Sequence, residues 1–198
     1  MGRIFYVMGK SASGKDSIYR ELINDKELSL KGVVMYSTRP MRAGETDGKD
    51  YHFISPERLS QLEADGRIIE ERTYDTVYGP WTYATVDDGQ IDLSSGDYLM
   101  VGVLSAYIRM KAYYGAENIV PLYVEVEDGE RLMRAIRREQ AGVPKYAEMC
   151  RRFLADSEDF SEDNLAAAGI EKRYDNSDLQ ACIEEIRTMI VNLKNGEK

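Results

Sequence analysis

The sequence predicts an α/β protein with a central parallel sheet covered by helices. Two observations predict this class. Short apolar runs of strand length alternate with helical patterns along the chain, and the first run ends in a glycine-rich turn that opens a helix. With 198 residues, 43% of them hydrophobic, the chain is long enough for one such core with small appendages. This composition disfavours a disordered or a fibrous protein.

Four apolar runs are candidates for buried strands. They are RIFYVM (3–8), VVMYS (33–37), DYLMVGV (97–103) and IVPLYVEV (119–126). The helical pattern SIYRELI (17–23) follows the first run, and further helical stretches lie between and after the others. In the C-terminal segment 178–194, helical spacing aligns Leu179, Ile183, Ile186, Ile190 and Leu193. This segment is expected to pack on the sheet.

Two stretches interrupt the alternation. Residues 37–88 are polar, rich in tyrosine and punctuated by Gly and Pro, which suggests a small antiparallel insert. Residues 131–152 hold seven Lys and Arg against two Glu, a local reversal of charge in an acidic chain. We therefore divide the chain into a core (1–36, 89–127 and 160–198), an insert (37–88) and an arginine-rich segment (128–159).

Composition also limits the classes of function. A net charge of −9 disfavours broad electrostatic binding to nucleic acid or to an anionic membrane. Cys150 and Cys182 lack metal-ligand spacing, and His52 lies in an alternating stretch where a strand residue is expected. The apolar stretches are too short for a spanning helix or a signal peptide, so a cytoplasmic protein is expected.

A phosphate-binding loop is indicated at the end of the first predicted strand. Gly9, four residues, Gly14 and Lys15 match the pattern G-x-x-x-x-G-K. Such a turn aims backbone N–H groups and the positive end of a helix at a phosphate, and its lysine reaches the β- and γ-phosphates. The residues expected to bind ATP are Gly9, Ser11, Ala12, Ser13, Gly14, Lys15, Asp16 and Ser17. A strand–helix turn with a capping serine is the alternative, and the position directly after the first strand argues against it.

Asp16 stands where this loop pattern has a serine or threonine that contacts magnesium. A carboxylate is also a hard oxygen ligand suited to Mg²⁺, so Asp16 is a candidate metal ligand. The alternative is an acidic residue favoured by the helix dipole, with Ser17 or Ser13 making the contact on the metal side.

A second anion site is expected in YSTRPMRAGETDGKDYHF (36–53). Arg39 and Arg42, with the hydroxyls of Ser37 and Tyr51, suit a second phosphate because guanidinium forks match its oxygens. A solvated loop is the alternative for Arg42 alone.

Farther on, GRIIEERTYDTVYG (66–79) holds Glu70, whose carboxylate can accept two N–H donors from a guanine edge. The same stretch holds Tyr78, which can bond the phosphate. For Glu70 alone, a solvated position is again the alternative.

The string STRP, two residues, AGETDGKDYHF resembles the monophosphate-binding loop of the guanylate kinase family. The resemblance implies a P-loop kinase fold in which the insert binds the acceptor and the arginine-rich segment forms a helical lid. It places the following residues at GMP: Ser37, Arg39, Arg42, Tyr51, Glu70 and Tyr78. Near the end, YDNSDL (174–179) is similar to the family's Asn-x-Asp-Leu segment by the adenine, which implies that Asn176 contacts ATP.

The lid of that family carries arginines that cover the transferring phosphate. The matches here are Arg134, Arg138 and Arg152, which the resemblance implies as catalytic together with Lys15. Arg134 and Arg138 share a helix face by their i,i+4 spacing. A solvated helix surface is the competing interpretation, above all for Arg131 and Arg137.

The chain differs from the family pattern at three places. Asp16 replaces the usual hydroxyl. After the Tyr-Gly pair that ends at Gly79, the family commonly has a Ser or Thr that helps to read guanine, whereas this chain has Pro-Trp, with Thr82 as a candidate substitute. The family's acidic strand motif is expected within residues 99–103, which contain no Asp or Glu. The metal arrangement and the base specificity therefore stay open.

The resemblance implies transfer of a phosphoryl group from ATP to GMP with Mg²⁺, in purine nucleotide metabolism. It implies a monomer or homodimer with nucleotide substrates as partners and with neither nucleic acid nor membrane. Two alternatives stay open. The Gly-Lys-Asp-Ser string also resembles ribose 1,5-bisphosphate phosphokinases, whose acceptor has no base to read. A catalytically silent binding module is the other, and the joint presence of Lys15, the acceptor clamp and the arginines argues against it.

Overall fold

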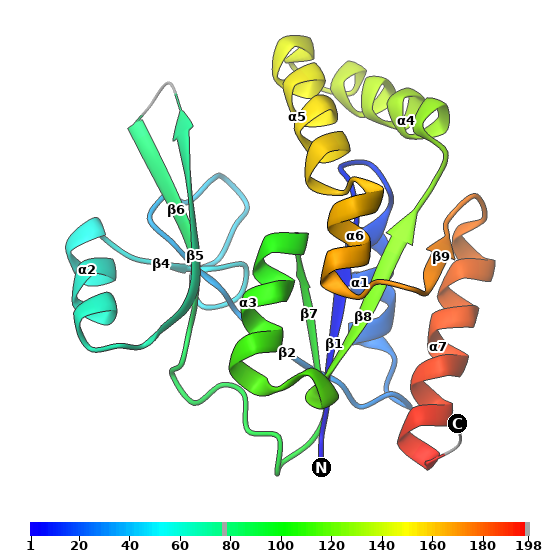
Figure 1. Ribbon diagram of the computed structural model, residues 1–198. Helices are drawn as coiled ribbons and strands as arrows, with labels where there is room; N and C mark the ends of the chain where they lie inside the picture. Colours follow the sequence, from blue (N-terminus) through cyan, green and yellow to red (C-terminus); the bar gives the residue numbers. More distant parts are fainter. Residues whose placement is uncertain (77–78, 197–198) are drawn as a thin grey trace.

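The computed structural model of the chain describes residues 1–76 and 79–196, and it contains two sheets (Figure 1). The larger sheet has the order β2-β7-β1-β8-β9, and all of its strands run parallel. These strands are β1 (Ile4–Met8), β2 (Lys31–Gly32), β7 (Tyr98–Gly102), β8 (Ile119–Glu125) and β9 (Arg173–Asp175). The predicted class, a central parallel sheet covered by helices, is confirmed.

Helices cover both faces of this sheet because its central strand is apolar on both sides. Ile4, Tyr6 and Met8 point into one hydrophobic cluster, whereas Phe5 and Val7 point into the other. The first cluster includes side chains of α3 (Leu104–Tyr114) and α6 (Glu162–Ala168), and the second includes those of α1 (Lys15–Asn24) and α7 (Leu179–Asn195). The predicted packing of the C-terminal segment on the sheet is confirmed.

The second sheet lies beside the core, at the left of Figure 1, and has the order β4-β3-β6-β5. Its elements are β3 (Tyr36–Ser37), β4 (His52–Phe53), β5 (Ile68–Thr76) and β6 (Gly79–Val86), with α2 (Pro56–Ala64) between β4 and β5. β6 runs antiparallel to both β3 and β5, but β3 and β4 run parallel. The insert is therefore a mixed sheet rather than a purely antiparallel one.

One predicted strand is wrong. The run 33–37 does not form a single buried strand, because the chain pairs as β2 at the edge of the core sheet and as β3 in the second sheet. Between them, the amide and carbonyl of Val34 bond to the side chain of Gln90, at 2.9 and 3.1 Å, instead of to a neighbouring strand. The apolar run is the crossing from one sheet to the other.

The arginine-rich segment forms α4 (Asp128–Gln140) and α5 (Tyr146–Asp159), which stand above the carboxyl end of β8 (Figure 1). A short 3-10 turn, η1 (Ala116–Asn118), leads into β8. In the described part of the chain, no helix combines the length and apolar character that crossing a membrane requires. The division into core, insert and lid stays a prediction.

Candidate functional site

The phosphate loop lies between β1 and α1, at the carboxyl edge of the parallel sheet. Gly14 takes a left-handed conformation (φ 94°) directly before α1, and Ala12 is left-handed as well (φ 64°). No side chain caps the first turn of α1, so its N–H groups stay available to an anion. The local sequence thus builds the nest that was expected from its glycines.

The side chain of Asn176 fixes the shape of this loop through a hydrogen bond to its backbone. Its Nδ2 donates to the carbonyl oxygen of Ser13 at 2.6 Å, and its side chain is buried. A Cβ at Gly14 would overlap with the same Nδ2. The structure therefore places Asn176 beneath the loop, where it braces the backbone that would hold the phosphates.

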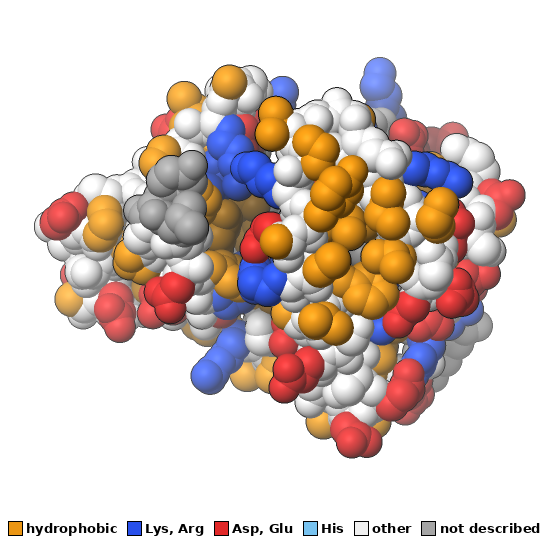
Figure 2. Space-filling model, turned by 90° about the horizontal axis from the view of Figure 1, so that it is seen from above, with side chains coloured by type: hydrophobic (Ala, Val, Ile, Leu, Met, Phe, Trp, Pro, Cys, Tyr) orange, Lys and Arg blue, Asp and Glu red, His pale blue; other side chains and the backbone are white. Residues whose placement is uncertain are grey.

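A cavity of about 220 Å³ opens between the phosphate loop and the second sheet. Figure 2 shows a hollow between the two parts of the molecule, with Lys and Arg side chains on its rim. The residues that line the cavity are Lys15, Asp16, Met35, Tyr51, Arg72, Tyr74, Tyr83, Val101, Gly102 and Val103. Lys15 and Tyr51, predicted for different substrates, thus face one space. A larger cavity, about 360 Å³, lies between β9 and α7 and contains none of the predicted residues.

Asp16, the predicted magnesium ligand, is accessible from the cavity. Its carboxylate is 74% exposed, lines the cavity and lies 3.8 Å from the Nζ of Lys15. No group of three or more acidic, His or Cys side chains able to hold a metal occurs among the described residues. Mg²⁺ commonly binds through one or two carboxylates plus phosphate oxygens and water, so this donor set fits the ion.

Arg39 is held by a residue that the sequence reasoning missed. Its guanidinium donates to both carboxylate oxygens of Glu45, at 2.6 and 2.7 Å, and stacks 5.0 Å from the ring centre of Tyr51. The hydrogen bonds from Arg39 lower the pKa of Glu45 to about 2. Glu45 thus occupies the fork of Arg39 that was predicted to hold a phosphate.

The other predicted acceptor residues are not all brought together. The Ser37 hydroxyl donates to the carbonyl of Thr82 at 3.2 Å, and Arg42 is exposed. The Thr82 hydroxyl bonds that of Thr73 at 2.8 Å, on the face of β6 opposite to Tyr83. The structure therefore gives no support to Thr82 as a substitute guanine reader. Tyr78 lies outside the described residues.

Glu70 is buried, and only one of its two carboxylate oxygens has a hydrogen-bond partner among the described residues. Its Oε1 accepts from the Thr85 hydroxyl at 2.8 Å, and its Oε2 lies 3.4 Å from the Nε of Arg72. Arg72 lines the cavity, as do Tyr74 and Tyr83. These three residues were not predicted, although strand alternation places Arg72 and Tyr74 on the same side as Glu70.

The three predicted lid arginines differ in their surroundings. Arg134 donates to the carbonyl of Asn176 and to Glu130, both at 2.9 Å, and would contact a Cβ at Gly14. Arg138 and Arg152 are 51% and 41% exposed, with distant ion pairs to Glu139. Only Arg134 lies at the phosphate loop.

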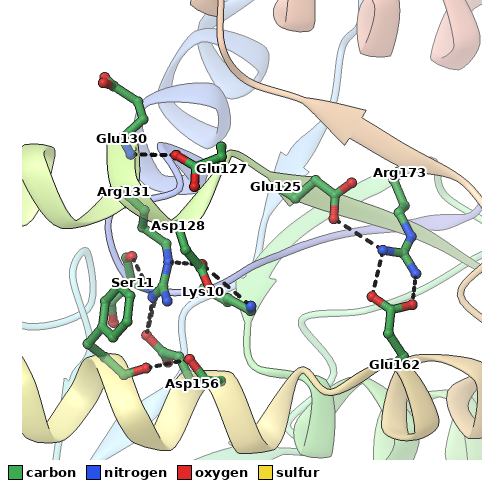
Figure 3. A network of polar contacts seen from close by, with 12 residues as sticks. Lys10, Ser11, Glu125, Glu127, Asp128, Glu130, Arg131, Asp156, Glu162 and Arg173 are labelled. Carbon is green, nitrogen blue, oxygen red and sulfur yellow. Dashed lines mark hydrogen bonds and ion pairs between the residues drawn. The ribbon is translucent and has the colours of Figure 1, made fainter.

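Arg131 corrects the expectation of a solvated helix surface, because its side chain is only 1% exposed. Figure 3 shows it between Asp128 of its own helix and Asp156 of α5, at 3.0 and 3.4 Å. Asp156 also accepts from the backbone N–H of Ser11 at 2.7 Å. An ionic network thus joins α4 and α5 to the loop between β1 and α1, whereas Arg137 is exposed as expected.

Comparisons with known proteins agree with this geometry. The family model for guanylate kinase matches residues 1–88. The chain is 26% identical to a guanylate kinase of Porphyromonas gingivalis, over 96% of this chain and 97% of that protein. It is 29% identical to a guanylate kinase of Chlorobaculum tepidum, over 96% and 92% of the two chains.

Other similarities are more local or more distant. A guanylate kinase of Syntrophotalea carbinolica is 37% identical, but the match spans 39% of this chain and only 37% of that protein. A crystal structure of guanylate kinase from Anaplasma phagocytophilum superposes with a TM-score of 0.63 at 19% identity, covering 96% of this chain and 84% of the other. At that identity the likeness establishes a shared fold.

Proposed function

We propose that the chain belongs to the guanylate kinase family and transfers the γ-phosphoryl group of ATP to GMP, giving ADP and GDP. The observation that carries this proposal is the single cavity lined by Lys15 and Asp16 on one side and by Tyr51 on the other. Phosphoryl transfer needs a donor site and an acceptor site that face each other, with little covalent chemistry from the protein.

The donor side neutralises charge. The loop amides and the first turn of α1 cradle the β-phosphate, Lys15 reaches the β- and γ-phosphates, and Arg134 lies at the rim of the same loop. Asp16 would hold Mg²⁺ together with the nucleotide phosphates, and the ion would supply further charge neutralisation at the transferring group. Asn176 acts on the nucleotide indirectly, through the backbone at Ser13.

The acceptor side orients the GMP phosphate. Arg39 exchanges Glu45 for the phosphate, and Tyr51, packed against the Arg39 guanidinium, donates its hydroxyl. Ser37, Arg42 and Tyr78 complete the clamp that the family resemblance implies. Arg138 and Arg152, exposed on the lid, cover the transferring phosphate when lid and insert close and exclude water.

The test is a coupled assay of ADP release with ATP and Mg²⁺, comparing GMP, dGMP, AMP, UMP and ribose 1,5-bisphosphate as acceptors. We expect turnover that depends on GMP. Turnover with ribose 1,5-bisphosphate alone would place the chain with the sugar kinases. No turnover with any acceptor would leave the silent binding module.

Lys15→Met tests the phosphate-loop mechanism in the same assay. We expect activity to fall by at least about 100-fold, because the ammonium group stabilises charge on the transferring phosphate. Lys26→Met, at an exposed lysine beyond α1, is the matched control and should keep full activity. Unchanged activity in Lys15→Met would rule out this mechanism.

A further inference from the structure

The cavity-facing side of the β5–β6 hairpin carries an ordered row of polar side chains. Glu70 and Arg72 lie two residues apart on β5, so they point to the same side of the sheet. The strand register sets Thr85 opposite Glu70 and Tyr83 opposite Arg72. Three of these four side chains form a chain of contacts: Thr85 donates a hydrogen bond to Glu70, and Glu70 forms an ion pair with Arg72.

Within this row, the carboxylate of Glu70 is buried more deeply than the guanidinium of Arg72, which reaches the cavity. The side chain of Glu70 is only 2% exposed, whereas that of Arg72 is 15% exposed and lines the cavity. The Oε1 of Glu70 accepts from Thr85, whereas its Oε2 faces the Nε of Arg72 at 3.4 Å and has no hydrogen-bond partner among the described residues. Among the described residues, Glu70 does not line the cavity, so the charged group of this row that reaches the cavity is the guanidinium of Arg72.

The contacts of Arg72 leave its fork available to a ligand. Its Nε faces Glu70 at 3.4 Å but is buried without a hydrogen-bond partner among the described residues. Partial neutralisation by Glu70 lowers the cost of keeping this cation partly buried. Tyr74 and Tyr83 line the same cavity, with their rings packed edge to face and their centres 5.9 Å apart, and so add aromatic surface beside which a base can pack.

We infer that Arg72 is the residue that determines base specificity, by donating from its guanidinium to O6 and N7 of guanine, and that Glu70 is its positioning residue. The inference rests on the proposed function and refines it. Guanine presents two acceptors on this edge, which a guanidinium fork matches, whereas adenine presents an amino donor beside N7. The fork therefore favours GMP and rejects AMP. It also supplies a reader in a chain whose residues 99–103 carry no carboxylate.

This assignment differs measurably from a direct reading of guanine by Glu70. A carboxylate reader binds N1–H and the 2-amino group, so IMP, which lacks that amino group, would lose one of two contacts. A guanidinium reader contacts O6 and N7, which IMP and GMP share. With Arg72 as the reader, kcat/KM for IMP is expected within about threefold of that for GMP.

The experiment measures kcat and KM for GMP, IMP and AMP in the wild type and in Arg72→Met, Arg72→Lys and Glu70→Gln. We expect Arg72→Met to lower kcat/KM for GMP and IMP by about 10- to 100-fold, mainly through KM, and to leave that for AMP unchanged or raised. Arg72→Lys keeps the charge but not the fork, so it should also lose discrimination. Glu70→Gln should lower the GMP-to-AMP ratio by a smaller factor, which a merely structural role would not do.

Arg58→Met, at an exposed arginine of α2 in the same insert, is the matched control and should change nothing. Circular dichroism and thermal melting establish that each variant is folded, and Arg72→Lys keeps the test valid if Arg72→Met does not fold. A GMP-to-AMP ratio that survives in the folded Arg72 variants overturns the inference, as does a strong wild-type preference for GMP over IMP. Absence of wild-type turnover with GMP is a different result, because it removes the proposed function itself.

Discussion

Gly14 is the residue at which backbone conformation and packing most strictly limit substitution. It is left-handed, and the space beside its Cα is filled by the side-chain amide of Asn176. Gly44, in the acceptor loop, has a similar φ of 88° but nothing near the place of its Cβ. The two glycines therefore separate the cost of backbone strain from the cost of a steric clash.

We predict that Gly14→Ala abolishes ATP binding, whereas Gly44→Ala only destabilises the fold by about 1 kcal/mol. Both variants bear the strain of a left-handed alanine, but only the first displaces Asn176 from the phosphate loop. Calorimetric titration with ATP and thermal melting of both variants provide the check. Equal ATP affinity in the two variants would contradict this account of the loop.

The pairing of Arg39 with Glu45 makes the stability of the fold depend on pH in the acid range. Hydrogen bonds from Arg39 lower the pKa of Glu45 to about 2, whereas an unfolded chain titrates near its ordinary value of about 4.3. The folded state therefore binds the proton more weakly than the unfolded state does. The stabilisation is complete above about pH 4.5 and is lost as the pH falls toward 2.

We predict that Glu45→Gln melts below the wild type at pH 6 and that the difference narrows steadily on acidification. Melting temperatures measured from pH 6 to pH 2.5 test this, with Glu71→Gln on exposed β5 as the control. A difference that stays constant over this range would show that the Glu45 carboxylate does not carry the effect.

At the scale of elements, ion pairs connect α4 and α5 to each other and to the loop between β1 and α1. Arg131 of α4 contacts Asp156 of α5, lies with its Cζ 3.9 Å from the ring centre of Phe153, and sits 3.4 Å from the carbonyl oxygen of Ser11. Asp128 at the start of α4 lies 3.6 Å from Lys10. A movement of α4 or α5 would therefore displace groups that contact the phosphate loop.

We predict that Arg131→Met destabilises the protein by about 3 kcal/mol, because it leaves Asp156 without its cationic partner. Denaturant unfolding measures the change, and amide hydrogen exchange should show faster exchange in α5. Arg137→Met on the exposed side of the same helix is the matched control. Equal stability of the two variants would mean that the network contributes nothing.

Elements defined by local patterns were predictable from the sequence, and those defined by distant partners were not. The phosphate loop follows from glycines and a lysine within seven residues, so its position between β1 and α1 was predictable. The run 33–37 failed because its apolar residues join two sheets, which no local periodicity reveals. The burial of Arg131 could not be predicted because its ionic partner Asp156 lies on another helix, 25 positions away.

The predicted acceptor site shows the same limit within one strand. Alternation along 68–76 indicates that Glu70 and Arg72 share a face, but not that Arg72 is the one exposed to the cavity. That order depends on Thr85, which reaches Glu70 only because β6 pairs with β5 in this register. Similarly, Glu45 lies in the expected phosphate loop, but its bond to Arg39 depends on the fold of that loop.

At the scale of the whole molecule, the two cysteine thiols differ in their exposure to solvent. Cys150 is exposed on α5, whereas Cys182 is buried where α7 packs on the core. Burial raises the pKa of the Cys182 thiol to about 11, so little of it is thiolate at neutral pH.

We predict that one thiol per chain reacts with an alkylating reagent at pH 7.5 in the native protein and that two react in denaturant. Mass spectrometry of labelled peptides identifies the site, and Cys150→Ser is the control that should leave the native protein unlabelled. Fast native labelling at Cys182 would mean that α7 detaches from the core without global unfolding.

The bond from Asn176 to Ser13 joins positions 163 residues apart, and β1 pairs only with strands made much later in the chain. During synthesis on a ribosome, the loop sequence emerges long before the side chain that fixes its shape. A nascent chain therefore carries an unsupported loop until Asn176 has left the ribosome. The order of synthesis thus makes this loop a late step of folding, although its own residues are made earlier than that side chain.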